Sequence, residues 1–179
     1  YISSLGLPEE EIYNNYINDA INDQEEELYV FFINTIDDLD RLIDIDKKGH
    51  KNPYSWRGLH APVYKFFTEF QETKDRALDK NQLIKYQQHF FDYLNKSSIH
   101  LQAVFAYLFA TRMKVNNDST REVASLVPAL AYKYAISVDR EVHSTTMNSV
   151  LESPKFSYLY SFNVLRRPTQ YMWDVVKTD

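Results

Sequence analysis

Glycine is scarce in this chain of 179 residues, which contains only Gly6, Gly49 and Gly58. Loops that cradle a nucleotide phosphate need several glycines close together, because side chains would keep the backbone amides away from the phosphate. The tight turns of β-hairpins also favour glycine, since they require positive φ. The sequence therefore excludes Walker-type and Rossmann-type nucleotide sites and favours an all-α fold.

Apolar residues recur at helical spacing through the first half of the chain. We expect one helix after Pro8, a second that ends in a cationic turn and C-cap at 47–49, a third that begins at Pro62 and a fourth that begins at Asn81. Residues 28–33 alone are also compatible with a β-strand, because a short apolar run does not distinguish the two structures.

A helix of about residues 98–115 is predicted to be the buried centre of the fold. Ser97 or Ser98 is its expected N-cap, and the segment Ala103–Ala110 is apolar on every side. A helix without a polar face is usually buried all round. We therefore expect the other helices to pack around this one.

Further helices are expected after the central one. A capping box of Ser119 and Glu122 opens the first of them, and Pro128 should kink it or split it in two. Another helix is expected at about 139–152, and Ser153–Pro154 opens the next. No period of 20 to 50 residues is evident in the sequence, although successive helical hairpins could still stack.

The chain length suits one ordinary domain, and no linker-like segment interrupts it. We predict a single all-helical domain over residues 1–179. Its seven or eight helices should pack around the central helix as an irregular bundle or a short stack of helical hairpins.

Charge is strongly segregated along the chain. Of the 25 acidic residues, 13 lie in Tyr1–Asp46 with Arg41 as the only base, which gives that stretch a net charge of −12. Lys47–Asp179 holds 19 bases and 12 acids, a net charge of +7. Such an uneven charge distribution can orient a partner, but it does not identify the partner. We expect the acidic helices of residues 8–46 to fold back on the basic remainder, 47–179, and to limit access to it.

Several chemistries lack support in the sequence. Cysteine is absent, and no apolar run approaches the roughly 18 residues of a membrane helix. No secretory leader is evident, so we expect an intracellular protein, cytoplasmic or nuclear, that does not contact a membrane. The sequence also lacks serine-nucleophile motifs, so no catalytic residues are assigned and an enzyme is not predicted.

Metal and cofactor sites are likewise not predicted. The five histidines never lie three or four residues apart, so no helix presents a paired imidazole site. Asp44–Gly49 imitates the start of a calcium loop, but Lys48 and Ser55 occupy positions that need oxygen ligands, including the bidentate carboxylate. We therefore expect no metal ion and no cofactor.

Aromatic residues beside bases mark the expected partner-binding surface. They lie near prolines or bases and away from the helical stripes, where aromatic and arginine side chains form binding hot spots. They are Tyr54, Trp56, Arg57, Arg166, Arg167, Tyr171 and Trp173. The sequence favours a protein-interaction or scaffold domain that recognises a partner segment. The alternative is a helical domain that binds nucleic acid through its basic, Tyr- and Trp-rich part. An enzyme whose site is assembled only by folding is a third hypothesis.

Overall fold

The computed structural model describes residues 26–49, 55–77 and 80–166, and within them it contains eight α-helices and no strand. The all-α prediction is confirmed, and the run at 28–33 is helical. The chain divides into two compact units, residues 1–101 and 102–179, which are described separately. The expectation of a single domain stays a prediction.

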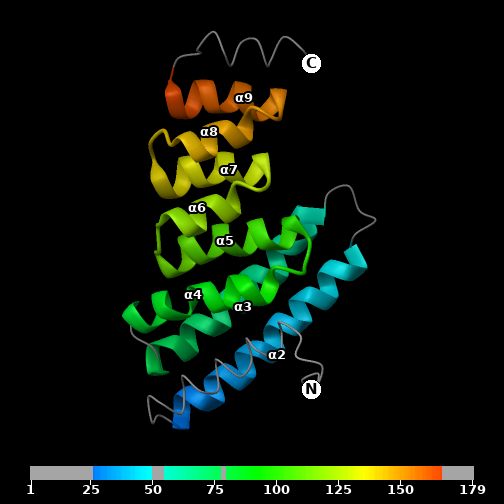
Figure 1. The fold of residues 1–179 in the computed structure, drawn as a ribbon, viewed down its shortest axis with the longest axis vertical. Helices are drawn as coiled ribbons and strands as arrows, with labels where there is room; N and C mark the ends of the chain where they lie inside the picture. The colour runs from blue at the N-terminus through cyan, green and yellow to red at the C-terminus, as the bar shows by residue number, and fades with distance from the viewer. Residues whose placement is uncertain (1–25, 50–54, 78–79, 167–179) are drawn as a thin grey trace. The chain divides into compact units, whose positions relative to one another are not determined.

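Three long helices form most of unit 1: α2 (Glu26–Gly49), α3 (Ser55–Ala77) and α4 (Lys80–Leu94). Helix α2 packs against α3 and also contacts α4 (Figure 1). The prediction that the third helix begins at Pro62 is wrong, because α3 begins at Ser55 and continues through the proline. Leu59 and Val63 lie one turn apart and are both buried. Burial of this continuous apolar stripe offsets the backbone hydrogen bond that the proline removes.

Phenylalanine rings from α3 and α4 form an aromatic core in unit 1. The ring of Phe66 lies 5.0 Å from that of Phe67, and Phe70 meets Phe90 of α4 edge-on at 5.7 Å, both measured between centroids. All four side chains are buried. Such pairs add about 0.5–1.5 kcal/mol each to the energy of burying their surface.

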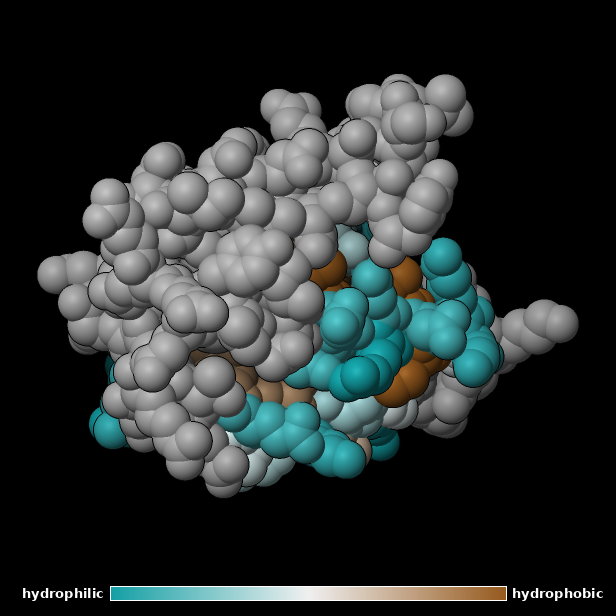
Figure 2. Space-filling model, turned by 90° about the horizontal axis from the view of Figure 1, so that it is seen from below, coloured by the Kyte–Doolittle hydropathy of each residue, from teal (hydrophilic) through white to brown (hydrophobic). Residues whose placement is uncertain are grey.

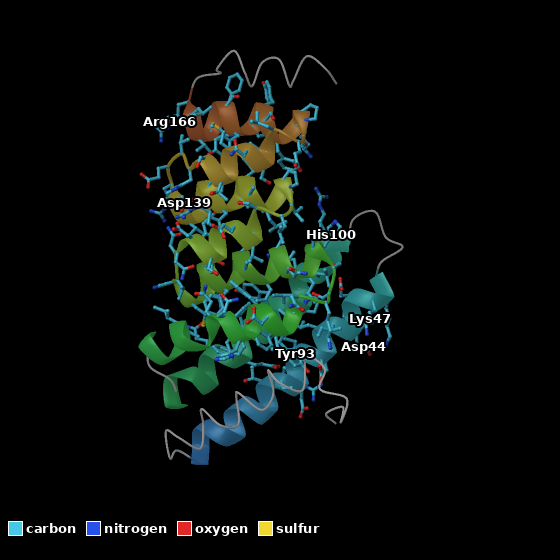
Figure 3. All side chains as sticks on the ribbon, viewed as in Figure 1. Asp44, Lys47, Tyr93, His100, Asp139 and Arg166 are labelled. Carbon is cyan, nitrogen blue, oxygen red and sulfur yellow. The ribbon has the colours of Figure 1, made fainter. Side chains whose placement is uncertain are left out.

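Acidic residues of α2 hold α2 against the end of α4 and the start of α5 (Ile99–Met113). The hydroxyl of Tyr93 donates to Asp40 at 2.6 Å (Figure 3 labels Tyr93). The carboxylate of Asp46 is buried and accepts from the backbone N–H and the hydroxyl of Ser98. Ser98 in turn accepts from the N–H of Leu101, which confirms it as the cap of α5. Part of the acidic excess is therefore used inside unit 1.

Helix α5 is largely buried, as its apolar sequence predicts, with Tyr107 of the apolar segment partly exposed. Its side chains less than one-tenth exposed are Leu101, Ala103, Val104, Phe105, Ala106, Leu108, Phe109, Ala110 and Met113. The helix spans the division between the two units, and it ends two residues earlier than expected.

Unit 2 is a stack of short helices: α6 (Asp118–Ala124), α7 (Pro128–Tyr134), α8 (Ser144–Val150) and α9 (Pro154–Tyr160). Figure 1 shows them as successive layers, and α7 contacts α6, α8 and α9. The prediction that Pro128 splits its helix is confirmed, because it is the first residue of α7. The predicted start at Ser153–Pro154 is also confirmed, since Ser153 caps α9.

The two hairpins of unit 2, α6–α7 and α8–α9, repeat one structural pattern with a period of 26 residues. Each second helix runs into a π-helical turn, at Ala135–Asp139 and Ser161–Leu165. The equivalent residues that are identical include Thr120 and Thr146, Pro128 and Pro154, Tyr134 and Tyr160, and Arg140 and Arg166. The expectation that the sequence holds no such period is therefore wrong. The period is hard to recognise in the sequence because only a few of the 26 equivalent positions hold identical residues.

Two helix starts in unit 2 also differ from their predictions. Asn117, rather than Ser119, caps α6, and it forms the capping box with Thr120. The helix expected from residue 139 begins at Ser144, because Arg140 adopts left-handed backbone geometry and ends the preceding turn.

Replacement of Phe105 by Ala should lower the free energy of unfolding by roughly 2–5 kcal/mol, because it leaves a cavity around a fully buried ring. Urea denaturation followed by circular dichroism would measure the loss. Ile99→Ala in the same helix is the matched control, since that side chain is about half exposed. Equal stability of the two variants would contradict the central role of α5.

Candidate partner-binding surface

A hydrogen bond between a threonine and a tyrosine closes each hairpin of unit 2. The hydroxyls of Thr120 and Tyr134 lie 2.7 Å apart, and those of Thr146 and Tyr160 lie 3.0 Å apart. In each pair the threonine belongs to the first helix and the tyrosine ends the second. The bond fixes which face of the second helix turns outward.

Burial raises the pKa of both tyrosines, and the hydrogen bond to threonine opposes this effect in each case. The neutral phenol is therefore the form that the folded state favours. These hydroxyls act as structural hydrogen-bonding groups rather than as reactive ones.

A buried ion pair joins α6 to the π-helical turn after α7. The guanidinium of Arg121 donates to both carboxylate oxygens of Asp139, at 2.9 and 2.8 Å, and to Asp118 at 2.7 Å. Asn116 accepts from Arg121 at 3.1 Å and from the hydroxyl of Tyr134 at 2.8 Å. The hydrogen bond to Asp139 raises the pKa of Arg121. Because the charges of Arg121 and Asp139 are paired with each other inside the fold, we assign this network a structural role.

Outside these bonds, the second helix of each hairpin and the π-helical turn after it carry an aromatic, an apolar and a basic residue, each four positions after the last. The aromatic residue lies in the α-helix, the apolar one in the π-helical turn and the basic one at the left-handed residue that ends this turn. The first hairpin presents Tyr132, Ile136 and Arg140, and the second presents Tyr158, Phe162 and Arg166. We call these six residues the repeat strip.

Three aromatic or apolar side chains of the strip are exposed to solvent, whereas an apolar stripe on a helix is usually buried. Tyr158 is 45% exposed, Phe162 is 51% exposed and Ile136 is 38% exposed, whereas Tyr132 is half-buried. Exposed aromatic and apolar side chains that gather on one face mark sites of interaction.

The basic members of the strip, Arg140 and Arg166, lie at the joints that end the two hairpins, and Lys114 occupies the equivalent position before the first hairpin. Lys114, Arg140 and Arg166 follow one another at intervals of 26 residues, and all three have positive φ, between 55° and 62°. All three side chains are exposed, and none forms a salt bridge with another described residue. Figure 3 shows Arg166 and Asp139, the neighbour of Arg140, at the same edge of the stack. This edge therefore offers unpaired positive charge.

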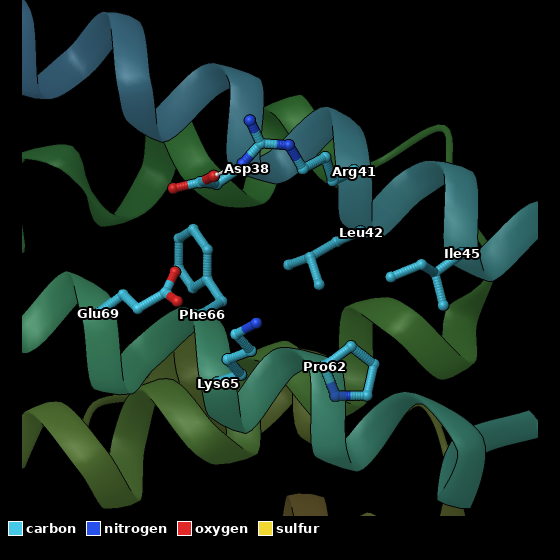
Figure 4. Close-up of a pocket in the computed structure, with 8 residues that line it drawn as sticks. All are labelled: Asp38, Arg41, Leu42, Ile45, Pro62, Lys65, Phe66 and Glu69. Carbon is cyan, nitrogen blue, oxygen red and sulfur yellow. Dashed lines mark hydrogen bonds and ion pairs between the residues drawn. The ribbon is translucent and has the colours of Figure 1, made fainter.

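Unit 1 offers a second candidate, an open pocket of about 170 Å³ between α2 and α3 (Figure 4). Its lining residues are Asp38, Arg41, Leu42, Ile45, Pro62, Lys65, Phe66 and Glu69. Each helix supplies one acid and one base to the rim, and Asp38 pairs with Arg41. Burial raises the pKa of Asp38. Figure 2, a view of the molecule from below, likewise shows hydrophilic side chains among apolar ones over its coloured surface. The balanced rim gives no preference for a charged ligand.

Few of the residues predicted to bind a partner can be placed. Arg57 and Arg166 are described and exposed, in unit 1 and unit 2 respectively. Trp56 lies in the first turn of α3, whereas the expected helix start at Pro62 placed it before the helix. Tyr54, Arg167, Tyr171 and Trp173 lie outside the described residues, as does the expected helix after Pro8. The partner-binding role of all seven stays a prediction.

The exposed apolar members of the strip, Ile136, Tyr158 and Phe162, are not among the residues that the sequence predicts to bind a partner. A helical stripe of apolar residues normally predicts burial, and these three residues continue such stripes. Their signal lies in the repeat: the pattern Tyr-x3-apolar-x3-Arg recurs after 26 residues.

Neither metal chemistry nor a membrane span is indicated by the residues that can be placed. In 26–49, 55–77 and 80–166, no group of three or more His, Cys, Asp and Glu side chains is arranged to hold a metal ion. Within the same ranges, no helix combines the length and apolar character needed to cross a bilayer.

Comparison with protein-family models, curated proteins and solved structures found no match to this chain. Its function must therefore be inferred from its own surface.

Arg121→Gln should lower the free energy of unfolding by about 3–5 kcal/mol, because it leaves the buried carboxylate of Asp139 without its partner. Urea denaturation measures the change, and exposed Lys155→Gln is the control. The double variant Arg121→Gln, Asp139→Asn should recover part of the loss. A change of under about 0.5 kcal/mol in the single variant, the usual range for surface substitutions, would contradict a structural ion pair.

Alkaline pH should destabilise unit 2 through Tyr134 and Tyr160. Their folded-state pKa values are raised above the unfolded value of about 10, so their contribution to stability is present below that pH. It is lost as pH rises from about 10 through the folded-state pKa. Denaturation curves against pH should therefore fall less steeply above pH 10 for Tyr134→Phe and Tyr160→Phe than for the wild type. Parallel curves would refute this linkage.

Proposed function

We propose that unit 2 is a protein-interaction module that binds a segment of a partner protein along the repeat strip. The observation that carries this proposal is the recurrence of the strip on two successive hairpins, 26 residues apart. Stacked helical hairpins present extended surfaces, and repeat proteins use such surfaces for binding.

The chemistry of the strip supports a protein partner. Aromatic and arginine side chains are enriched among the residues that dominate protein interfaces. Phe162 and Ile136 supply apolar area, and Arg140 and Arg166 supply donors for carboxylates or backbone carbonyls. A partner segment with apolar side chains and acidic groups at matching intervals fits this arrangement.

A nucleic-acid partner is the second candidate, because the rings of Tyr158 and Phe162 lie 4.8 Å apart on the same strip as Arg166. Stacked bases and a phosphate suit such a group. However, residues 102–179 contain nine bases and seven acids, so unit 2 has a net charge of only +2. Weak positive charge limits electrostatic attraction of a polyanion.

Selection from a displayed library of random peptides would test the proposal. The wild-type chain should enrich peptides that the double variant Ile136→Ser, Phe162→Ser binds at least about tenfold more weakly, since it loses two apolar anchors. Leu126→Ser is the matched control, because Leu126 is exposed to a similar degree in the same unit but lies off the strip. The proposal fails if no peptide is enriched, or if all variants bind the enriched peptides equally.

A salt series with a single-stranded oligonucleotide tests the second candidate. Nucleic-acid binding would weaken steeply with salt and would be lost on substitution of Arg140 and Arg166 by Gln. Peptide binding through apolar anchors should change little over the same range.

A further inference from the structure

One member of the repeat strip, the half-buried Tyr132, is partly covered by the second hairpin, and this cover is chemically specific. The ring of Phe156 lies 5.8 Å from that of Tyr132, between centroids. The side-chain amide of Asn163 donates to the hydroxyl of Tyr132 at 2.9 Å. The second hairpin therefore covers this tyrosine with an aromatic ring and an amide donor.

Tyr158 is the counterpart of Tyr132 one repeat later, and it lacks this cover. Its ring is nearly half exposed and contacts Phe162 of its own strip. Among the described residues, none hydrogen-bonds its hydroxyl or stacks on it from another hairpin. The same surface thus occurs twice, once covered and once open.

We propose that the open Tyr158–Phe162 face binds an amphipathic helix of a partner protein that carries an aromatic residue and, seven positions later, an asparagine or glutamine. This inference rests on the proposed function and names the partner's structure and chemistry. The template is the internal contact, in which Phe156 and Asn163 are seven residues apart.

Phe156 lies in α9 and Asn163 in the π-helical turn after it, and both reach Tyr132. In a regular α-helix of a partner, seven residues are almost two full turns at 3.6 residues per turn, so a ring and an amide at this spacing also project from one face. That face can place the ring against Tyr158 and the amide against its hydroxyl together. Phe162, beside Tyr158, extends the apolar contact that an amphipathic helix requires.

A second copy of this chain cannot supply the same pair of groups. In each copy Phe156 and Asn163 already contact Tyr132 of the same molecule. Their release would uncover Tyr132 and break its hydrogen bond. The occupant that leaves these contacts intact is a helix from a different protein.

The test adds helical peptides to the full chain and measures affinity by isothermal titration. An alanine-based helix with Phe and Asn seven residues apart should bind, and one with the same residues five apart should not, because the amide then points to another face. Tyr158→Ala should raise the Kd about tenfold or more, through loss of the ring contact and the hydrogen bond. Tyr64→Ala is the matched control, since Tyr64 is a similarly exposed tyrosine on α3 in unit 1.

Tyr158→Phe keeps the ring and removes only the hydroxyl, so it remains informative if Tyr158→Ala unfolds. It should weaken binding of the Phe-Asn peptide by about two- to tenfold and leave binding of a Phe-Ala peptide unchanged. Equal binding of both spacings, or no effect at Tyr158, would overturn the inference. So would self-association of the chain that Tyr158→Ala abolishes, because the occupant would then be a second copy. If library peptides depend on Ile136 and Phe162 but lack this helical pattern, only the inference fails and the proposed function stands.

Discussion

Helices of seven residues are too short to persist alone in water, and unit 2 is built from four of them. Each must therefore bury one face against its neighbours. This requirement accounts for the layered arrangement of α6 to α9 and for the small side chains at its centre, such as Ala131 and Ala135. It also leaves each second helix with one outward face, which is where the repeat strip lies.

Polar bonds inside the stack determine which groups remain available outside it. The paired hydroxyls of Thr120 and Tyr134 and the ion pair of Arg121 with Asp139 satisfy groups that would be costly to bury alone. These residues are thereby committed to holding the hairpins closed. Among the described residues, the bases at the joints, Lys114, Arg140 and Arg166, are exposed and form no such ion pair.

Much of the fold could be predicted from the sequence, because local chemistry decides it. The apolar segment Ala103–Ala110 indicated a buried helix, and Pro128 indicated a break. The site could not be predicted in the same way. A π-helical turn after Tyr134 or Tyr160 adds a residue to the turn, so the ordinary 3.6-residue period no longer tells which side chains face inward. The repeat escaped detection because few of its equivalent positions hold the same residue.

The left-handed joints reveal a compromise between folding and binding. Glycine is the residue that adopts positive φ without penalty, whereas other residues lose roughly 1–2 kcal/mol there. Unit 2 contains no glycine, and lysine or arginine occupies all three described joints. A chain shaped for stability alone would place glycine at each of them. The molecule thus gives up stability at these three joints, and in exchange each of them carries a positive charge.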